Sequence, residues 1–315
     1  MTETILQLIN DYDTIIIHRH KNPDLDALGS QHGLKGLIEN NFTGKTVYVV
    51  GDDSELNFLG PMDTIDNDVY ADALAIIVDV AVSTLVSDKR YQNAAHVLVI
   101  DHHRNDSDIQ GTIYSEASHV AVCQLLGEMA LKHNLTLDEK TATALFSGLV
   151  TDSGRFKYAG TNGLTFDVAS FLVKHGADMR FVYDNLYTEK LSVKKLKGHF
   201  INQFSLTDKK VAYMKNPREL KKQFDVTTFT ISRGMVNQMA DIEGVPIWAN
   251  FTEDDDGDIQ CELRSKTLNI VDIAKKYGGG GHRNACGCTV KSWAITNQIL
   301  HDLDALIERN EHDGC

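Results

Sequence analysis

Short, continuous runs of apolar residues recur along the first half of this chain, and stretches with helical spacing lie between and after them. The runs are rich in β-branched residues and lack the polar alternation of a half-solvated strand, so we expect strands buried on both faces. These strands are predicted at 14–18, 47–50, 73–78 and 97–100. Helices are predicted at 26–40, 118–133, 139–150, 165–175 and 178–187. Strands that alternate with helices favour an α/β fold, with a parallel sheet covered by helices on both faces.

The pattern changes near residue 188. A Lys-rich stretch places Leu191, Leu196 and Phe200 at roughly helical spacing, which predicts a connecting helix. Beyond it, strands are predicted at 211–214, 245–252 and 259–264, and helices near 230–240, 268–276 and 292–310. The domains that we expect are an N-terminal domain at 1–187, a linker helix at 188–210 and a smaller C-terminal α/β domain at 211–315.

An acidic run at 253–258 lies between two predicted strands. A calcium loop of the EF-hand type would need Asp or Asn at position 252 and Glu at position 263, where this chain has Thr252 and Leu263. A solvated hairpin turn is therefore the structure that we expect here.

Composition and charge narrow the possible function classes. The chain has 315 residues, of which 42% are hydrophobic and 24% charged, as is ordinary for a globular protein. The net charge of −13 argues against sequence-independent binding to long duplex DNA but is compatible with a small anionic substrate. No apolar run reaches the ~18 residues of a membrane span, and Met1–Thr4 lacks signal-peptide features, so we expect a cytoplasmic protein without membrane contact. Reduced thiols are expected at Cys123, Cys261, Cys286, Cys288 and Cys315.

Carboxylate and imidazole side chains follow three of the predicted strands. In chain order they are His20, Asp24, Asp26, Asp79, Asp101, His102 and His103. A single Asp at such a position has a structural explanation, because Asp often caps a helix or a loop. The combination goes beyond capping, since the carboxyl ends of parallel strands meet at one edge of a sheet and these side chains would converge there.

The convergent side chains predict a metal site. A further Asp, in Thr151-Asp152-Ser153-Gly154, follows an apolar helical segment and adds one more carboxylate. A set of O and N donors without Cys suits two Mn²⁺ or Mg²⁺ ions better than structural zinc. Two such ions about 3.5–4 Å apart are a common arrangement for cleaving phosphoesters.

Taken in order, these residues resemble the DHH phosphoesterase family. The matching elements are His20-x-x-x-Asp24-x-Asp26, Asp79, Asp101-His102-His103 and Thr151-Asp152-Ser153-Gly154. The C-terminal part is similar to the DHH-associated domain through Leu263-Arg264-Ser265 and the run from Gly278 to Gly287. Within the family, the compact two-domain layout looks like the nanoRNase / pAp phosphatase group.

The resemblance implies two metal sites that share one carboxylate. Their ligands would be His20, Asp24 and Asp79 at one site, and Asp26, Asp79, His102 and Asp152 at the other. Two further residues would be catalytic. Asp101 would stand beside or within the metal shell, and His103 would face the substrate phosphate or the departing oxygen.

Four consecutive glycines, Gly278–Gly281, follow a predicted helix. Taken alone, such a run favours a helix C-cap and loop, although its main-chain N–H groups can also approach a phosphate closely. Arg264 alone favours an ordinary surface residue. The resemblance assigns these residues to the substrate end that lies away from the metals. The substrate-binding set that it implies is Arg264, Ser265, Gly279, Gly280, Gly281 and His282.

The function implied by the resemblance is a metal-dependent phosphoesterase. It would degrade very short oligoribonucleotides to 5′-mononucleotides and remove the 3′-phosphate of pAp to give AMP, by attack of a hydroxide that bridges two ions, Mn²⁺ in preference to Mg²⁺. A cyclic di-AMP or pApA phosphodiesterase is the alternative, because both activities need the same ligands. A non-catalytic nucleotide-binding protein would have lost some of those ligands. Short RNA oligomers and small nucleotides are the expected partners, and a homodimer is a compatible assembly.

Overall fold

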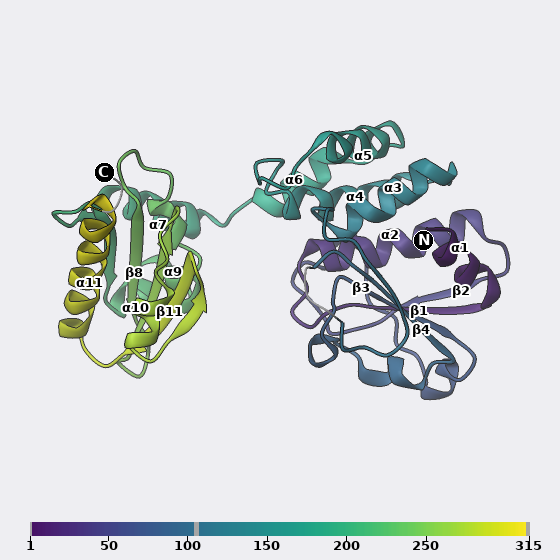
Figure 1. The fold of residues 1–315 in the computed structure, drawn as a ribbon, viewed down its shortest axis with the longest axis horizontal. Coiled ribbons are helices and arrows are strands. Elements are labelled where there is room, and N and C mark those ends of the chain that lie inside the picture. The colour runs from purple at the N-terminus through teal and green to yellow at the C-terminus, as the bar shows by residue number, and fades with distance from the viewer. Residues whose placement is uncertain (1, 104–106, 313–315) are drawn as a thin grey trace. The chain divides into compact units, whose positions relative to one another are not determined.

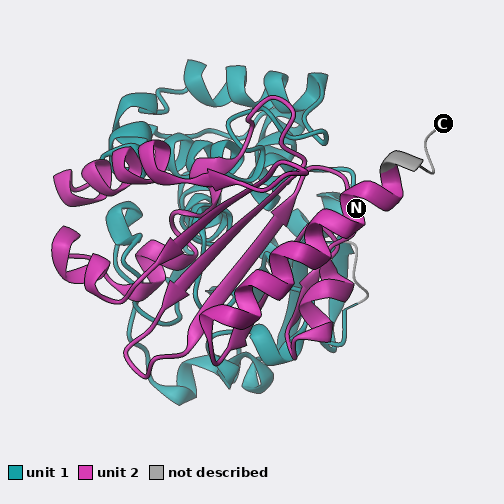
Figure 2. Ribbon diagram, turned by 90° about the vertical axis from the view of Figure 1, so that its left-hand side faces the viewer, with its two compact units in different colours: residues 1–188 teal, residues 189–315 magenta. Residues whose placement is uncertain are grey.

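The computed structural model of the chain describes residues 2–103 and 107–312. The chain forms two compact units, residues 1–188 and 189–315, each with its own sheet and its own hydrophobic core (Figures 1 and 2). In the described ranges, no helix is both long enough and apolar enough to cross a membrane. The four described cysteines are free thiols, as predicted, and Cys315 lies outside the described residues.

The first unit is built on a five-stranded parallel sheet in the order β2-β1-β3-β4-β5. Its strands are β1 (Thr14–His18), β2 (Thr46–Val49), β3 (Leu74–Val78), β4 (His96–Asp101) and β5 (Thr112–Ser115). The first four were predicted, and β3 is buried at every position, as its apolar run indicates. The edge strand β5 was not predicted, because its side chains are alternately half-buried and exposed and it contains no apolar run.

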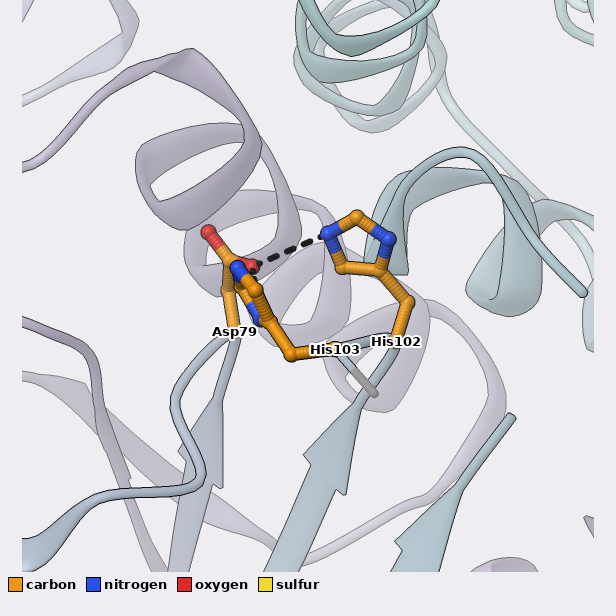
Figure 3. Close-up of side chains that lie close together, drawn as sticks. All are labelled: Asp79, His102 and His103. Atoms are coloured by element: carbon orange, nitrogen blue, oxygen red, sulfur yellow. Dashed lines mark ion pairs between the residues drawn. The ribbon is translucent and has the colours of Figure 1, made fainter. Parts of the chain in front are cut away.

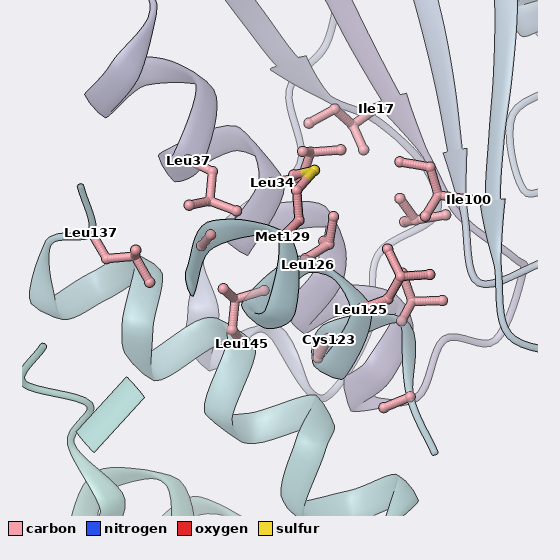
Figure 4. Close-up of a cluster of buried hydrophobic side chains, with 14 of the residues drawn as sticks. Ile17, Leu34, Leu37, Ile100, Cys123, Leu125, Leu126, Met129, Leu137 and Leu145 are labelled. Atoms are coloured by element: carbon pink, nitrogen blue, oxygen red, sulfur yellow. The ribbon is translucent and has the colours of Figure 1, made fainter. Parts of the chain in front are cut away.

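Helices cover one face of this sheet. In chain order the α-helices of the first unit are α1 (Thr2–Asp11), α2 (Leu25–Asn41), α3 (Val122–His133), α4 (Glu139–Asp152), α5 (Gly163–Lys174) and α6 (Met179–Tyr187). Strand residues such as Ile17 and Ile100 share a core with Leu34 of α2 and Leu126 of α3 (Figure 4).

The opposite face of the sheet is covered by short 3₁₀ segments. They are η2 (Asn67–Tyr70), η3 (Ser83–Leu85) and η4 (Lys89–Asn93), whereas η1 (Asn57–Leu59) lies beside α2, with Phe58 against Phe181 of α6. Tyr70 of η2 and Tyr91 of η4 pack there against strand residues. The α/β fold with a parallel sheet is confirmed, and the helices on this second face are short 3₁₀ segments because the connections at 50–73 and 79–95 lack helical spacing.

Helices α2 and α4 pack antiparallel and unusually close together. A Cβ atom on Gly29 would lie 2.4 Å from the carbonyl oxygen of Ala144, and one on Gly148 would lie 2.8 Å from Cα of Asp26. Only glycine permits this approach of two backbones. As a result, the start of α2, which carries Asp26, lies beside the end of α4, which carries Asp152.

The second unit contains a six-stranded sheet in the order β10-β11-β9-β8-β7-β6. Its strands are β6 (Ser205–Leu206), β7 (Val211–Asn216), β8 (Ile247–Glu253), β9 (Ile259–Ser265), β10 (Gly280–His282) and β11 (Ala285–Val290). Its helices are α7 (Leu191–Gln203), α8 (Glu219–Phe224), α9 (Thr228–Ser232), η5 (Val236–Met239), α10 (Val271–Lys276) and α11 (Trp293–His312). The smaller C-terminal α/β region is thus confirmed. Helix α7, in the segment predicted as a linker, packs inside this unit through Leu196 and Phe200.

Three details of the second unit differ from or support the predictions. The helix expected near 230–240 is divided into α9 and η5, because the N–H of Gly234 bonds back to Phe229 and ends the first helix. The strands β10 and β11 form a hairpin that was not predicted. The turn predicted at the acidic run is confirmed: β8 and β9 pair antiparallel, and the Asp254 side chain accepts hydrogen bonds from the N–H groups of Asp256 and Asp258.

Candidate metal centre and glycine loop

The residues predicted to bind metal converge at the carboxyl ends of β1, β3 and β4. Three overlapping groups each offer ligand atoms that lie within 4.8 Å of one another. The groups are His20, Asp24 and Asp79; Asp26, His102 and Asp152; and Asp79, His102 and His103. Figure 3 shows the last group, with Asp79 and the two histidines at the ends of neighbouring strands.

Asp79 belongs to two of these groups through different oxygens. Its Oδ2 lies 3.5 Å from Nε2 of His20, and its Oδ1 lies 3.4 Å from Nε2 of His102. The residue has a φ of 58°, a left-handed conformation that is uncommon outside glycine, and its N–H donates to the carbonyl of Ile100 at 3.0 Å. This turn ends β3 and holds the carboxylate between the two histidines.

His20 and Asp24 occupy the loop between β1 and α2. Asp24 is the N-cap of α2, and its Oδ1 accepts hydrogen bonds from the N–H groups of Asp26 and Ala27. Nδ1 of His20 lies 2.9 Å from the carbonyl oxygen of Lys21, and its Nε2 lies 3.8 Å from Oδ1 of Asp24. Asp24 therefore caps the helix, and the same hydrogen bonds orient its carboxylate toward the imidazole of His20.

Asp26 is held by the N-terminus of α3. The N–H groups of Val122 and Cys123 donate to its two oxygens at 2.7 and 2.9 Å, which favours the ionised carboxylate. Sequence patterns missed this support, because the donors are main-chain groups and the side chains of Val122 and Cys123 give no sign of them.

His102 is oriented by a main-chain carbonyl. Its Nδ1 lies 3.2 Å from the carbonyl oxygen of His119, which leaves Nε2 directed at the carboxylates. That nitrogen lies 3.7 Å from Oδ2 of Asp152 and 3.8 Å from Oδ2 of Asp26. Asp152 reaches the site from the end of a helix, through the close packing of α2 and α4 described above.

The electrostatics of this group fit bound cations. Burial, together with the carboxylate of Asp79, raises the pKa of Asp26 to about 7, and burial with Asp26 raises the pKa of Asp152 to about 8. Oδ1 of Asp79 and Nε2 of His102 are buried and have no hydrogen-bond partner among the described residues. Divalent ions would offset the repulsion of the carboxylates and occupy those atoms, so the O and N donors present fit two hard or borderline cations.

Asp101 and His103 form a pair beside this group. Asp101 is the last residue of β4 and is almost completely buried, whereas the His103 side chain is 48% exposed. Nδ1 of His103 lies 2.8 Å from Oδ1 of Asp101. Asp101 is absent from the three ligand groups, so the geometry favours a supporting position for it over a ligand position.

A cavity of about 320 Å³ opens over the ligands in the first unit. Asp79, His103 and Asp152 line one part of it, together with His20 and Asp24. The rest of its lining comes from Lys21, Val80, Ala81, Val82 and Leu85.

The glycine loop lines a second cavity, of about 640 Å³, in the second unit. Its lining includes Gly279–Gly281, His282 and Arg264 from the predicted set, together with Gly278. A Cβ atom on Gly279 would lie 2.0 Å from the carbonyl oxygen of Gly287, so the loop needs glycine there to reach β11. Ser265 does not line this cavity: its hydroxyl donates to the carbonyl of Leu268 and accepts from Asn284, which ties the adjacent loop together.

Glu262 and Arg233 also line this cavity, and the sequence analysis missed both of them. Arg264 donates to Glu262 at 2.9 Å and to the carbonyl of Leu263 at 2.8 Å, so its guanidinium has a fixed position. Arg233, from the end of α9, lies 3.7 Å from the same Glu262 carboxylate. An exposed Arg and a Glu in a strand have no local pattern that distinguishes them from ordinary surface residues.

Comparisons with known proteins agree with this arrangement. The model of the DHH family, N-terminal domain, matches residues 14–149, and the model of the DHHA1 domain matches residues 210–309. The chain is 33% identical to the "Bifunctional oligoribonuclease and PAP phosphatase NrnA" of Bacillus subtilis, over 99% of this chain and 100% of that protein. It is 37% identical to the protein of the same name from Mycoplasma genitalium, over 96% of each chain.

Two further similarities are more distant. "Cyclic-di-AMP phosphodiesterase PdeA" of Listeria monocytogenes is 25% identical, and the match covers 97% of this chain but 49% of that protein. Among solved structures, an exopolyphosphatase-related protein from Bacteroides fragilis superposes with a TM-score of 0.81 at 22% identity, over 98% of this chain and 97% of that one. The latter similarity supports the fold.

Proposed function

The chain belongs to the DHH family, with a DHH domain followed by a DHHA1 domain, and from that premise we propose that it degrades very short oligoribonucleotides to 5′-mononucleotides and removes the 3′-phosphate of pAp to give AMP. It is a hydrolase of phosphoester bonds. The observation that carries the proposal is that Asp79 takes part in both donor groups, one with His20 and one with His102. The relatives that match over their full length are named for these two activities.

The metal ligands of the proposal are those that the sequence analysis assigned. His20, Asp24 and Asp79 would hold one ion, and Asp26, Asp79, His102 and Asp152 the other. When bound, two divalent ions supply Lewis-acid stabilisation of the phosphoryl oxygens and lower the pKa of water. We propose Mn²⁺ in preference to Mg²⁺, because imidazole ligands occur at both positions and Mg²⁺ favours an all-oxygen shell.

The chain's own residues orient the reaction. Asp101 fixes Nδ1 of His103, which leaves Nε2 of His103 to donate a hydrogen bond to the phosphate or the departing oxygen. The main-chain contacts of His20 and His102 hold Nε2 of each ring toward the carboxylates. Because these hydrogen bonds already hold the imidazole rings in position, the side chains need little rearrangement during the reaction.

The glycine loop is proposed to bind the end of the substrate that lies away from the metals. Main-chain N–H groups of Gly279–Gly281 can approach a phosphate, and Arg264 and His282 contribute donors. A net charge of −13 offers little attraction for the backbone of a long nucleic acid, which agrees with a short substrate.

A turnover comparison tests the proposal. RNA dimers to pentamers, a 20-nucleotide RNA, pAp, pApA and cyclic di-AMP would each be incubated with the full chain and Mn²⁺, Mg²⁺ or EDTA. We expect rapid turnover of the short RNAs and pAp with Mn²⁺, and none with EDTA. Faster turnover of cyclic di-AMP than of short RNA would favour the alternative phosphodiesterase, and no turnover of short RNA or pAp would contradict the proposal.

A further inference from the structure

The cavity over the metal-binding residues has one wall that metal binding does not explain. Besides the carboxylates and histidines, its lining includes the apolar residues Val80, Ala81, Val82 and Leu85. Leu85 remains 44% exposed in this position, next to some of the most polar residues of the first unit. Neither a metal ion nor a phosphate gains from an apolar neighbour, so this wall suits a different part of a ligand.

The backbone conformation of Asp79 places this wall beside the metal centre. The left-handed turn at Asp79 directs the chain out of the sheet immediately after the carboxylate, and Val80 and Ala81 follow directly. The segment then forms η3, which ends at Leu85. The bridging carboxylate and the apolar wall are thus only a few residues apart in the sequence. The turn at Asp79 therefore positions both of them.

The wall is held rigidly on both sides. The N–H of Lys21 donates to the carbonyl of Leu85 at 2.8 Å, and the N–H of Ser87 donates to the carbonyl of Arg19 at 2.9 Å. On the other side, the hydroxyl of Ser107 donates to the carbonyl of Ala81 at 2.9 Å. A preformed surface of this kind is typical of a ligand site, since little conformational entropy is lost when the ligand binds.

We propose that Val82 and Leu85, with Lys21 at the rim, form the subsite for the nucleoside that carries the attacked phosphate. The inference rests on the proposed function. A nucleobase or ribose has flat or weakly polar faces that an apolar wall can cover, and the attached phosphate would lie toward the ligands. The cavity, at about 320 Å³, lies within the size range of small-molecule sites. Lys21 supplies positive charge to the anionic part of the same nucleotide.

Paired substrates separate base recognition from phosphate chemistry. KM and kcat would be measured with Mn²⁺ for pAp and for the same ribose bisphosphate without its base. For Leu85→Ala we expect KM for pAp to rise about fivefold with kcat unchanged, and KM for the abasic compound to stay within about twofold. Lys21→Gln should raise KM for both compounds, because it removes a positive charge from the lining of the cavity and both compounds carry phosphate.

The control is Leu131→Ala, which removes an equally exposed leucine of α3, 40% exposed, that lies outside the cavity. It should leave both KM values unchanged. Equal KM values for the wild type and Leu85→Ala with pAp would overturn the subsite, even if the enzyme is active as proposed.

Calorimetric titration with AMP gives a result that does not depend on turnover. In the presence of Mn²⁺ we expect AMP to bind the Leu85→Ala variant about fivefold more weakly than it binds the wild type. Equal affinities for AMP, or no binding by the wild type, would overturn the subsite. The proposed function is tested by a different measurement: it is contradicted if the wild type turns over neither short RNA nor pAp.

Discussion

Nδ1 of His103 lies 2.8 Å from Oδ1 of Asp101, which joins a half-exposed imidazole to a carboxylate buried at the end of β4. The hydrogen bond raises the pKa of His103 and fixes which ring nitrogen faces away from the carboxylate. Two of the three residues in the Asp101-His102-His103 run thus form an oriented pair, while His102 belongs to two of the ligand groups and His103 to one.

This pair should behave as one unit in a double-mutant cycle. His103→Ala should lower kcat by about 10²–10⁴-fold, the range of a positioned proton donor. Asp101→Asn should lower kcat by about 10–100-fold, because the ring loses its orienting partner. The double variant should be no slower than His103→Ala alone. Additive losses in steady-state kinetics would show that the two residues act independently.

Removal of Asp79 should affect both metal sites at once. Asp79→Ala is expected to abolish turnover of RNA dimers and of pAp, and to reduce the number of Mn²⁺ ions bound in calorimetric titrations. The matched control, Asp167→Asn on the exposed side of α5, should retain wild-type values. Near-normal turnover of Asp79→Ala with Mn²⁺ would contradict the site assignment.

Stability without metal should fall as the pH rises. Asp26 and Asp152, with pKa values of about 7 and 8 against an ordinary 3.8, keep protons in the folded state that the unfolded chain has released. His20 and His102 act in the same direction: burial lowers their pKa values, but neighbouring carboxylates outweigh it and raise them to about 10 and 9. Stability should therefore decline between about pH 4 and pH 10.

Mn²⁺ should reverse this decline, because it takes the place of those protons. Thermal unfolding with EDTA and with Mn²⁺ at pH 5.5 and pH 8.5 measures both effects. We expect a lower Tm at pH 8.5 in EDTA, and a larger increase of Tm on adding Mn²⁺ at pH 8.5 than at pH 5.5. An equal increase at both pH values would argue against proton displacement by the metal.

The glycine loop offers a matched pair of substitutions. Gly279→Ala should destabilise the protein by about 1–3 kcal/mol, because its Cβ would lie 2.0 Å from the carbonyl oxygen of Gly287. Gly280→Ala should be tolerated, since nothing lies within 4 Å of its added Cβ. Tm values for the two variants provide the check, and a similar loss for both would show that the loop is not packed as described.

His282 and Arg283 provide a second pair, at adjacent exposed positions of which the first lines the cavity. His282→Ala should raise KM for pAp about tenfold with little change in kcat, as expected for the loss of one hydrogen bond to a charged group. Arg283→Ala should leave KM nearly unchanged. An unaltered KM for His282→Ala would remove the role proposed for the loop in substrate binding.

Several features could be predicted because they depend on local sequence. The central strands are continuous apolar runs, and His20, Asp79 and Asp101 lie at or just beyond their carboxyl ends, so the sheet geometry alone brings these residues to one edge. The turn after β8 was predictable from its acidic residues and its glycine. These predictions succeed because the same few residues carry the side-chain pattern and determine the local backbone structure.

Other features depend on contacts between distant segments. The sequence places Asp152 at the end of an apolar helix, but the close approach of α2 and α4 through Gly29 and Gly148 is what delivers it to Asp26. The strand character of β10 was hidden, because glycine has low strand propensity and the hairpin forms by pairing with β11, which itself pairs with β9.

The sequence by itself determined the α/β fold and the family, and it predicted the residues proposed to carry the chemistry, because each lies in a recognisable local pattern. The tertiary structure decided how those residues divide their roles. It placed Asp79 between two histidines, paired Asp101 with His103, and set the main-chain donors of α3 on Asp26. Those relationships arise from helix packing and backbone turns, whose effect on side-chain position is visible only when the chain is folded.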